Sequence, residues 1–200
     1  PILTFLDYAA AFPSVGHAWV WAVLIKICIP AGLMNAIEKM YENNTGYCSI
    51  DVVAILIFLI LCGVLQGCPL SGTLFVMVMD PIMHLFQIYI EDPGHGRIRA
   101  CSDDVGGAIK RLVELKRMYF ISEAVRKATG LSLKPNKCII ILQTCVASEH
   151  NISIIRQWLM QEIPEWAAFQ VSNAGKYLGI YMGPKSVSLL LGWTDPKIPG

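Results

Sequence analysis

Two adjacent acidic residues, Asp103 and Asp104, constrain this chain most, because they stand between two short runs, 97–101 and 105–109, that have the character of β-strands. The pair is therefore expected in the tight turn of a β-hairpin. Two carboxylates held side by side repel each other unless a cation neutralises them. This is the usual arrangement of a divalent-metal site. A solvated turn is the alternative, and it stays open unless other residues support a metal.

The composition indicates a globular chain with much to bury. Of 200 residues, 54% are hydrophobic and 16% are charged. That balance excludes a disordered chain, and it suits one domain or one domain and part of another. The chain also opens directly on an apolar run, 1–6, without an initiator Met. We therefore expect a fragment of a larger protein.

The cysteines and the longest apolar run bear on the compartment. Seven Cys show no C-x-x-C spacing, which argues against zinc or redox motifs and favours a reducing, intracellular location in the nucleus or cytoplasm rather than secretion. Cys28, Cys62 and Cys138 lie in apolar runs and are expected in the core. Residues 52–65 carry no charge, but a membrane-spanning helix needs about 20 residues. A buried strand or core helix is the favoured interpretation, with no membrane partner.

Charge is distributed unevenly along the chain. The net charge is +1, yet residues 97–137 hold ten Lys or Arg and four acids, which gives +6. Residues 1–96 hold two bases and seven acids, which gives −5. A local excess of positive charge suits a polyanionic partner. For the stretch 110–127, a solvated helix face is an equally good explanation.

The order of elements predicts the fold class. We expect strands over 2–6, 51–65 and 138–145, the hairpin around Asp103, and a last strand over 176–181. Helices are expected over 19–29, 33–41, 74–89, 111–129 and 152–160, with Gly130 ending the fourth. This order predicts an α/β (α+β) fold in which helices cover one face of an antiparallel sheet. In such a fold, Asp7 at the end of the first strand can meet Asp103 across neighbouring strands.

Five segments in this order resemble the catalytic motifs of reverse transcriptases of the non-LTR (LINE-type) retrotransposon family. They are 5–12 (FLDYAAAF), 66–75 (QGCPLSGTLF), 102–104 (SDD), 130–138 (GLSLKPNKC) and 176–179 (KYLG). The resemblance implies a right-hand polymerase palm with part of the fingers. It implies partial fingers and palm over 1–145, and the end of the palm with the primer-grip region over 146–200, leading toward a missing thumb.

The resemblance also implies the reaction, which is RNA-directed DNA synthesis by nucleotidyl transfer from a dNTP to a primer 3′-hydroxyl on an RNA template. Two Mg²⁺ ions, with Mn²⁺ as an alternative, would be held by Asp7 and Asp103, and Asp104 would be the third acid. The second acid of such a pair can point away from the metals. For Asp7, a role as a strand-end cap is the alternative.

Further residues match substrate-binding positions of the family. Phe12 would lie beneath the sugar and exclude a 2′-hydroxyl, or else is an ordinary core Phe. Lys137 would donate a proton to pyrophosphate or offset its charge, or else is a surface Lys. The remaining matches are Gln66 and Gly67, which would lie beside the incoming nucleotide and template, and Tyr177, Leu178 and Gly179, which would grip the primer or merely form a strand with a turn.

Three positions depart from the family pattern. Pro13 stands where an acid is frequent, Leu65 where Arg is frequent, and Ser102 where Ala or Val precedes the acid pair. None of these departures removes a metal ligand. They therefore put the fine positioning of the site in question rather than its metal chemistry. The prediction is a reverse transcriptase fragment. The alternatives are a degenerate, non-catalytic relative that only binds nucleic acid, and a membrane-associated structural protein.

Overall fold

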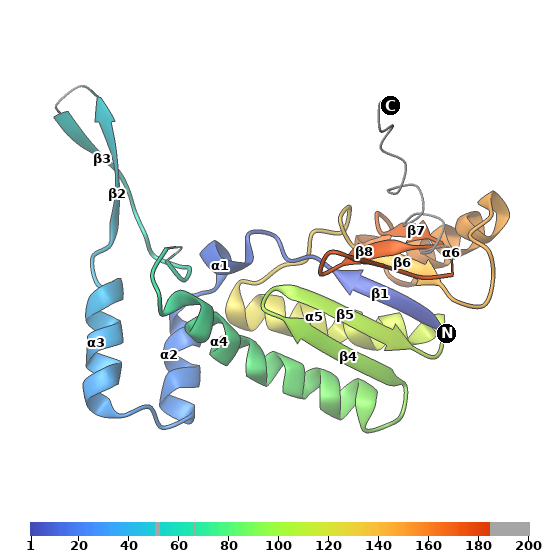
Figure 1. Ribbon diagram of the computed structural model, residues 1–200, viewed down its shortest axis with the longest axis horizontal. Coiled ribbons are helices and arrows are strands. Elements are labelled where there is room, and N and C mark those ends of the chain that lie inside the picture. The colour runs from blue at the N-terminus through green and yellow to red at the C-terminus, as the bar shows by residue number, and fades with distance from the viewer. Residues whose placement is uncertain (51–52, 66, 185–200) are drawn as a thin grey trace, which may run out of the picture.

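A five-stranded sheet forms the centre of the computed structural model, which describes residues 1–50, 53–65 and 67–184 (Figure 1). Its strands, in spatial order, are β4 (Gly96–Cys101), β5 (Asp104–Ile109), β1 (Ile2–Leu6), β6 (Ile139–Leu142) and β7 (Gln170–Ser172). The pairings are antiparallel except that between β6 and β7, which is parallel. The predicted hairpin around the acid pair is confirmed as β4–β5.

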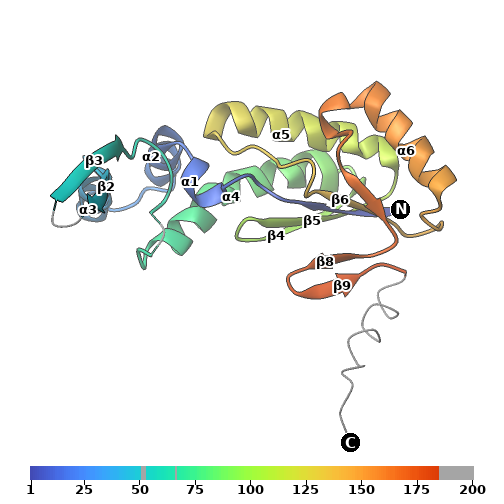
Figure 2. The same ribbon diagram turned by 90° about the horizontal axis from the view of Figure 1, so that it is seen from above.

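Helices cover one face of this sheet, as Figure 2 shows. They are α4 (Ser71–Phe86), which continues as the π-helical turn η1 (Gln87–Glu91), α5 (Leu115–Thr129) and α6 (Glu149–Glu162). A short 3-10 turn, η2 (Leu112–Glu114), leads into α5, and another, η3 (Pro164–Trp166), follows α6. The prediction of helices on one face of the sheet is confirmed, and the parallel strand β7 is an addition to it.

Alternation along the central strands separates the two faces. Thr4 is fully buried. A Cβ atom added to Gly107 would lie 3.2 Å from the methyl group of Thr4 and 3.7 Å from Met118 of α5. Val105 and Ile109 are also buried, on the same face of β5 as Gly107. Because successive residues of a strand point to opposite faces, the even-numbered residues of β1 face the helices and the odd-numbered ones face away.

The helix α5 ends where the sequence predicts. Gly130 adopts a left-handed conformation with φ of 83°, and its N–H donates to the Arg126 carbonyl. A Cβ at Gly130 would lie 2.7 Å from the Ser14 carbonyl oxygen, so glycine also permits close packing of the chain there. The helix begins at Leu115 rather than at the predicted residue 111.

The N-terminal helices form an arm beside the sheet. They are α1 (Ala11–Ser14), α2 (His17–Lys26) and α3 (Ala31–Tyr41). The helix expected over 19–29 is apolar on nearly every side, which predicts burial all round, but that prediction is wrong on one side. Val23 and Leu24 are buried, but Ile25 is exposed, and Ile27 lies beyond the end of the helix and is exposed too. Apolar residues on every side of a helix do not show whether a second layer covers it.

A two-stranded ribbon, β2 (Thr45–Ile50) with β3 (Val53–Leu59), projects away from the sheet (Figure 1). The predicted strand within 51–65 is therefore present, but the prediction that it is buried is wrong. Every residue of β3 is exposed, including Phe58 at 57%. Figure 1 shows the ribbon projecting away from the sheet, and the exposed apolar side chains of β3 have no covering layer in the described part of the chain.

The last described elements form a second hairpin, β8 (Gly175–Tyr177) with β9 (Ile180–Met182), on the face of the sheet opposite the helices (Figure 2). The prediction of one strand over 176–181 is wrong, because the chain reverses within it. Leu178 and Gly179 have φ of 49° and 84° and connect the paired residues Tyr177 and Ile180. Two successive positive φ values are the geometry of a tight hairpin turn.

Two further expectations concern membranes and cysteines. Among the described residues, one helix, Ser71–Glu91, is long and apolar enough to cross a membrane by length and composition alone. Its Phe75, Val78 and Phe86 are fully buried in the core, and the core helix of a globular domain has this composition too. All seven cysteines are free, and Cys138 is buried as predicted. Cys28 and Cys62 are exposed, so their assignment to the core is wrong.

Candidate active site

The acidic residues converge at one end of the sheet. Asp7 directly follows β1, and Asp104 begins β5, whose Val105 pairs with Leu6. The turn between β4 and β5 is tight, with Ser102 in the left-handed region at φ of 56°. By strand alternation, Asp7 and Asp104 lie on the face away from the helices. The predicted meeting of the first strand with the acid hairpin is therefore present.

The pKa of Asp104 reports this crowding. Partial burial raises the pKa of its carboxyl above the ordinary value, and the negative charges of Asp103 and Asp7 raise it further. Like charges at close range disfavour the ionised form unless a cation offsets them. Three carboxylates from two neighbouring strands thus form one electrostatically coupled cluster.

The cluster offers the ligands of a hard divalent cation, since Mg²⁺ prefers carboxylate oxygens. The described residues nevertheless contain no group of three or more His, Cys, Asp or Glu close enough together to enclose a metal ion. Carboxylate oxygens therefore suit Mg²⁺, but the three side chains are not close enough together, as they stand, to coordinate one ion as a group.

The backbone of Asp7 is fixed from the neighbouring segment 130–138. The N–H of Asp7 donates to Sγ of Cys138 at 3.4 Å, and the N–H of Lys134 donates to the Asp7 carbonyl at 2.8 Å. Burial raises the pKa of the Cys138 thiol to about 11, so the sulfur stays uncharged beside the acid cluster. Sequence reasoning missed this anchor, although a cysteine directly before an apolar strand was its signal.

The same segment brings Lys137 near the acids. The N–H of Ala9 donates to the Ser132 carbonyl at 2.8 Å, so the segment after α5 runs alongside the chain that follows Asp7. Lys137 lies in a turn in which its own N–H donates to the Lys134 carbonyl at 2.8 Å. Lys137 is exposed to solvent. The first and fourth motifs are therefore adjacent in space.

Phe12 and the second motif meet beside α1. The ring of Phe12 stacks on Phe75 of α4 with centroids 4.3 Å apart, and its carbonyl accepts the N–H of Val64 at 2.7 Å. A Cβ on Gly67 would have no atom within 4 Å, so that side of the loop is open. The predicted Gln66 lies outside the described residues.

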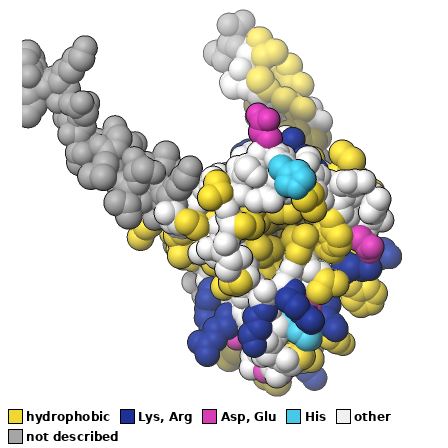
Figure 3. All heavy atoms as spheres, turned by 90° about the vertical axis from the view of Figure 1, so that its right-hand side faces the viewer, with side chains coloured by type: hydrophobic (Ala, Val, Ile, Leu, Met, Phe, Trp, Pro, Cys, Tyr) yellow, Lys and Arg dark blue, Asp and Glu magenta, His cyan; other side chains and the backbone are white. Residues whose placement is uncertain are grey.

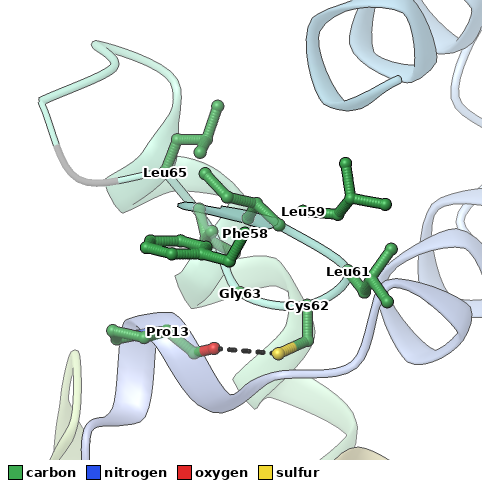
Figure 4. A pocket seen from close by; sticks show the side chains of 9 residues that line it. Pro13, Phe58, Leu59, Leu61, Cys62, Gly63 and Leu65 are labelled. Carbon is green, nitrogen blue, oxygen red and sulfur yellow. Dashed lines mark hydrogen bonds between the residues drawn. The ribbon is translucent and has the colours of Figure 1, made fainter. Parts of the chain in front are cut away.

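A pocket of about 370 Å³ lies between this loop and the base of the ribbon (Figure 4). Pro13 and Phe58 line it, and the Cys62 thiol donates to the Pro13 carbonyl at 3.4 Å. Pro13 is one of the three departures from the family pattern. Its carbonyl accepts this bond just before the second motif, but a backbone contact of this kind is available to any residue at position 13 and does not explain the departure.

Tyr177 lies beneath the acid hairpin rather than at a free surface. Its hydroxyl donates to the Asp104 carbonyl at 3.2 Å, and its ring stacks on Phe5 with centroids 4.9 Å apart. Leu178 and Gly179 form the adjoining turn, and Leu178 is exposed. The structure thus brings the third and fifth motifs together.

The basic segment surrounds the acid pair in sequence but not in space. Arg97 and Lys110 lie at the far end of the β4–β5 hairpin, about 16 Å from its tip for five extended residues. Figure 3 shows Lys and Arg gathered on the lower part of the face at that end of the molecule. Lys134 and Lys137 lie in the segment whose backbone contacts Asp7.

Several other basic side chains are neutralised within the protein. The carboxylate of Glu114 is buried and pairs with Arg111 at 2.6 Å and Arg117 at 3.1 Å. Burial raises the pKa of Glu114, but the hydrogen bonds and charges of its partners outweigh burial and lower the pKa overall. This ionic cluster was not predicted, and it differs from both explanations offered for 110–127, because Arg111 and Arg117 pair with a buried acid of the same chain.

Comparison with known proteins agrees with this geometry. Residues 1–182 match the family described as reverse transcriptase (RNA-dependent DNA polymerase). A curated relative, the Retrovirus-related Pol polyprotein from type-2 retrotransposable element R2DM of Drosophila melanogaster, is 26% identical over 190 residues and covers 88% of this chain.

Solved structures of telomerase share the fold. The telomerase of Candida tropicalis, in its apo form, is 13% identical, covers 92% of this chain and has a TM-score of 0.52. The telomerase of Candida albicans is 10% identical, covers 91% of this chain and has a TM-score of 0.54. The chain spans 17% of the retrotransposon polyprotein, and 34% and 30% of the two telomerase chains. The predicted palm-like fold and family resemblance are confirmed.

Proposed function

The chain belongs to the reverse transcriptase family, and on that premise we propose that it is the palm-centred part of an RNA-directed DNA polymerase whose acids hold two divalent cations. One observation carries the proposal. Burial, and then the negative charges of Asp103 in the β4–β5 turn and Asp7 at the end of β1, raise the pKa of Asp104, so the three acids lie within electrostatic reach of one another. Strands are rigid supports for such a cluster.

The chemistry divides between the cations and the chain. Asp7, Asp103 and Asp104 would hold two Mg²⁺ ions, or Mn²⁺ in their place, and bound ions would supply activation of a primer 3′-hydroxyl and neutralisation of charge on the leaving pyrophosphate. The chain supplies the placement of the carboxylates, with the Asp7 backbone held by Cys138 and Lys134. Lys137, in the adjoining turn, offsets the pyrophosphate charge or donates a proton to it.

The substrates in this proposal are an RNA template, a DNA primer and a dNTP. Phe12, fixed by its stack on Phe75, would exclude a 2′-hydroxyl from the sugar site. Gly67 has open space beside it, which suits close approach of a nucleotide or template to the backbone. Gln66 would join it there, while Leu178 and Gly179, in the exposed turn after β8, would contact the primer.

We extend the proposal to organisation and compartment. Residues 1–145 would carry the fingers remnant and most of the palm, and 146–200 the end of the palm toward a thumb. The seven free cysteines suit a reducing nucleus or cytoplasm.

The test is primer extension by a longer polypeptide that contains this chain with its flanking sequence. With an RNA template, a DNA primer and Mg²⁺, the unaltered protein is expected to extend the primer. Asp103→Ala should reduce extension below detection while template–primer binding, followed by fluorescence anisotropy, is unchanged, because the cluster loses a metal-binding carboxylate. Asp92→Ala, in the exposed turn after η1, is the matched control and should extend normally.

Two results would count against the proposal. Normal extension by Asp103→Ala would remove the metal role of the hairpin. Binding of template–primer without extension by the unaltered protein would favour the second candidate, a non-catalytic relative that binds nucleic acid.

A further inference from the structure

We propose that Tyr177 is a positioning residue that holds the tip of the acid hairpin against β1, and that it does not contact the primer. The inference rests on the proposed function, since it concerns the same acid cluster. It divides the predicted substrate-binding trio of Tyr177, Leu178 and Gly179, because the three residues have different surroundings in the structure.

The hydroxyl of Tyr177 is directed at the hairpin backbone. It donates to the Asp104 carbonyl at 3.2 Å, and the Arg99 carbonyl lies at 3.5 Å. Asp104 begins β5 and Arg99 belongs to β4, so the hydroxyl lies between the two strands that carry the acid turn. A hydroxyl has one proton to donate, and the shorter contact is the one to Asp104.

The ring of Tyr177 is held against the first strand. It stacks on Phe5 with centroids 4.9 Å apart and planes inclined by 18°. Phe5 precedes Asp7 by two residues, so both are on the face of β1 away from the helices. One side chain therefore touches the strand that presents Asp7 and the backbone that presents Asp104.

Glycine makes this contact possible. Gly106 pairs with Phe5 across β1 and β5, and a Cβ at Gly106 would lie 3.0 Å from Cζ of Tyr177 and 3.2 Å from Cε2. Such distances are tighter than ordinary van der Waals contact, so any side chain at 106 would press on the ring. The flat floor made by Phe5 and Gly106 fits an aromatic ring at 177.

The hydroxyl remains a donor in the working pH range. The phenol of a tyrosine is protonated at neutral pH, so this hydroxyl has a proton to donate. A primer contact would have to compete with the carbonyl of Asp104 for the same proton. Leu178 is 49% exposed at the turn, and its side chain has no hydrogen bond that a primer contact would have to replace.

The test compares Tyr177→Phe with Tyr181→Phe in the longer polypeptide. Tyr181 is on the facing strand β9 opposite Lys176, so alternation places it on the other side of the hairpin from Tyr177. Removing the Tyr177 hydroxyl deletes one hydrogen bond, and we expect kcat for single-nucleotide addition to fall about five- to tenfold. The KM for dNTP and the Kd for template–primer should stay unchanged, and Tyr181→Phe should match the unaltered protein.

A second variant disturbs the same contact from strand β5, against which the Tyr177 ring packs. Gly106→Ala leaves the hydroxyl in place but displaces the ring, and it should lower kcat with the same KM pattern. Thermal melting of each variant checks that the fold is kept. Because Gly106→Ala also strains the sheet, Tyr177→Phe is the deciding variant.

The outcomes separate the two proposals. A weaker template–primer Kd with unchanged kcat in Tyr177→Phe would make Tyr177 a primer contact and overturn the inference. An unchanged kcat with unchanged Kd would overturn it too. In either case the proposed function stands if Asp103→Ala is inactive in the same assay, whereas an active Asp103→Ala overturns the proposed function itself.

Discussion

Strand β6 of the central sheet and strand β3 of the ribbon are both apolar throughout, yet their surroundings are opposite. In β6, the sequence IIIL is nearly all buried, and Ile140 is fully buried between β1 and β7. In β3, the sequence VAILIFL is exposed throughout, and Ile55 is 46% exposed. Burial therefore depends on a covering layer, which helices supply for the sheet and no described residue supplies for the ribbon.

The difference also separates the parts of the molecule by role. The sheet is covered on one face by helices and on the other by the β8–β9 hairpin, and it holds the acids in fixed positions. Within the described residues the ribbon has two unpaired edges, and β3 exposes apolar side chains on both of its faces, which are features that favour association with another polypeptide. The site can thus be ordered in this chain although the ribbon has no cover.

The largest expected difference between the sheet and the ribbon is in the free energy of unfolding that a substitution costs. Ile140→Ala should lower the free energy of unfolding by about 2–5 kcal/mol, because it opens a cavity in the closed core. Ile55→Ala, the same change on the ribbon, should alter it by less than about 0.5 kcal/mol. Urea unfolding followed by circular dichroism measures both. Similar costs for the two variants would mean that the ribbon is packed in solution.

A charge placed on the ribbon should change the stability of the fold less than the core substitution does, but it should clearly change the solubility. Ile57→Lys, at a residue 59% exposed, should raise the concentration at which the chain stays monodisperse, because a charge blocks edge-to-edge pairing. Ile154→Lys, on α6 at 50% exposure, is the matched control and should change little. Light scattering as a function of concentration measures both. Equal gains would assign the effect to net charge alone.

Local signals predicted the parts of the fold that local chemistry decides. Gly130 ended α5 because left-handed backbone favours glycine, and the acid pair fell in a turn because the runs on either side formed strands. The order of elements then predicted that the end of the first strand would meet the acid hairpin, whereas the approach of the segment around Lys137 was not predicted. Asp7 and the hairpin tip are adjacent, and the segment around Lys137 lies alongside them.

Features that depend on distant contacts were missed. The exposure of Phe58 follows from the absence of a covering layer among the described residues, which no periodicity reveals. A turn after Tyr177 was only an alternative in the sequence analysis, and its place at Leu178 gave no local signal because a leucine rarely occupies positive φ. The anchoring of Asp7 by Cys138 joins residues 131 positions apart, so only the fold could place them together.

The central claim is that acids from two separate strands form one cluster, and the pKa of Asp104 tests it most directly. Carbon-13 NMR titration of the chain should show a raised pKa for Asp104, and Asp7→Asn should lower that pKa toward the ordinary value, whereas Asp92→Asn should not. A raised pKa in the folded state also means that stability falls as pH rises from the ordinary carboxyl pKa through the raised one. An Asp104 pKa that is unmoved by Asp7→Asn would contradict the account, because the two strands would then carry independent acids.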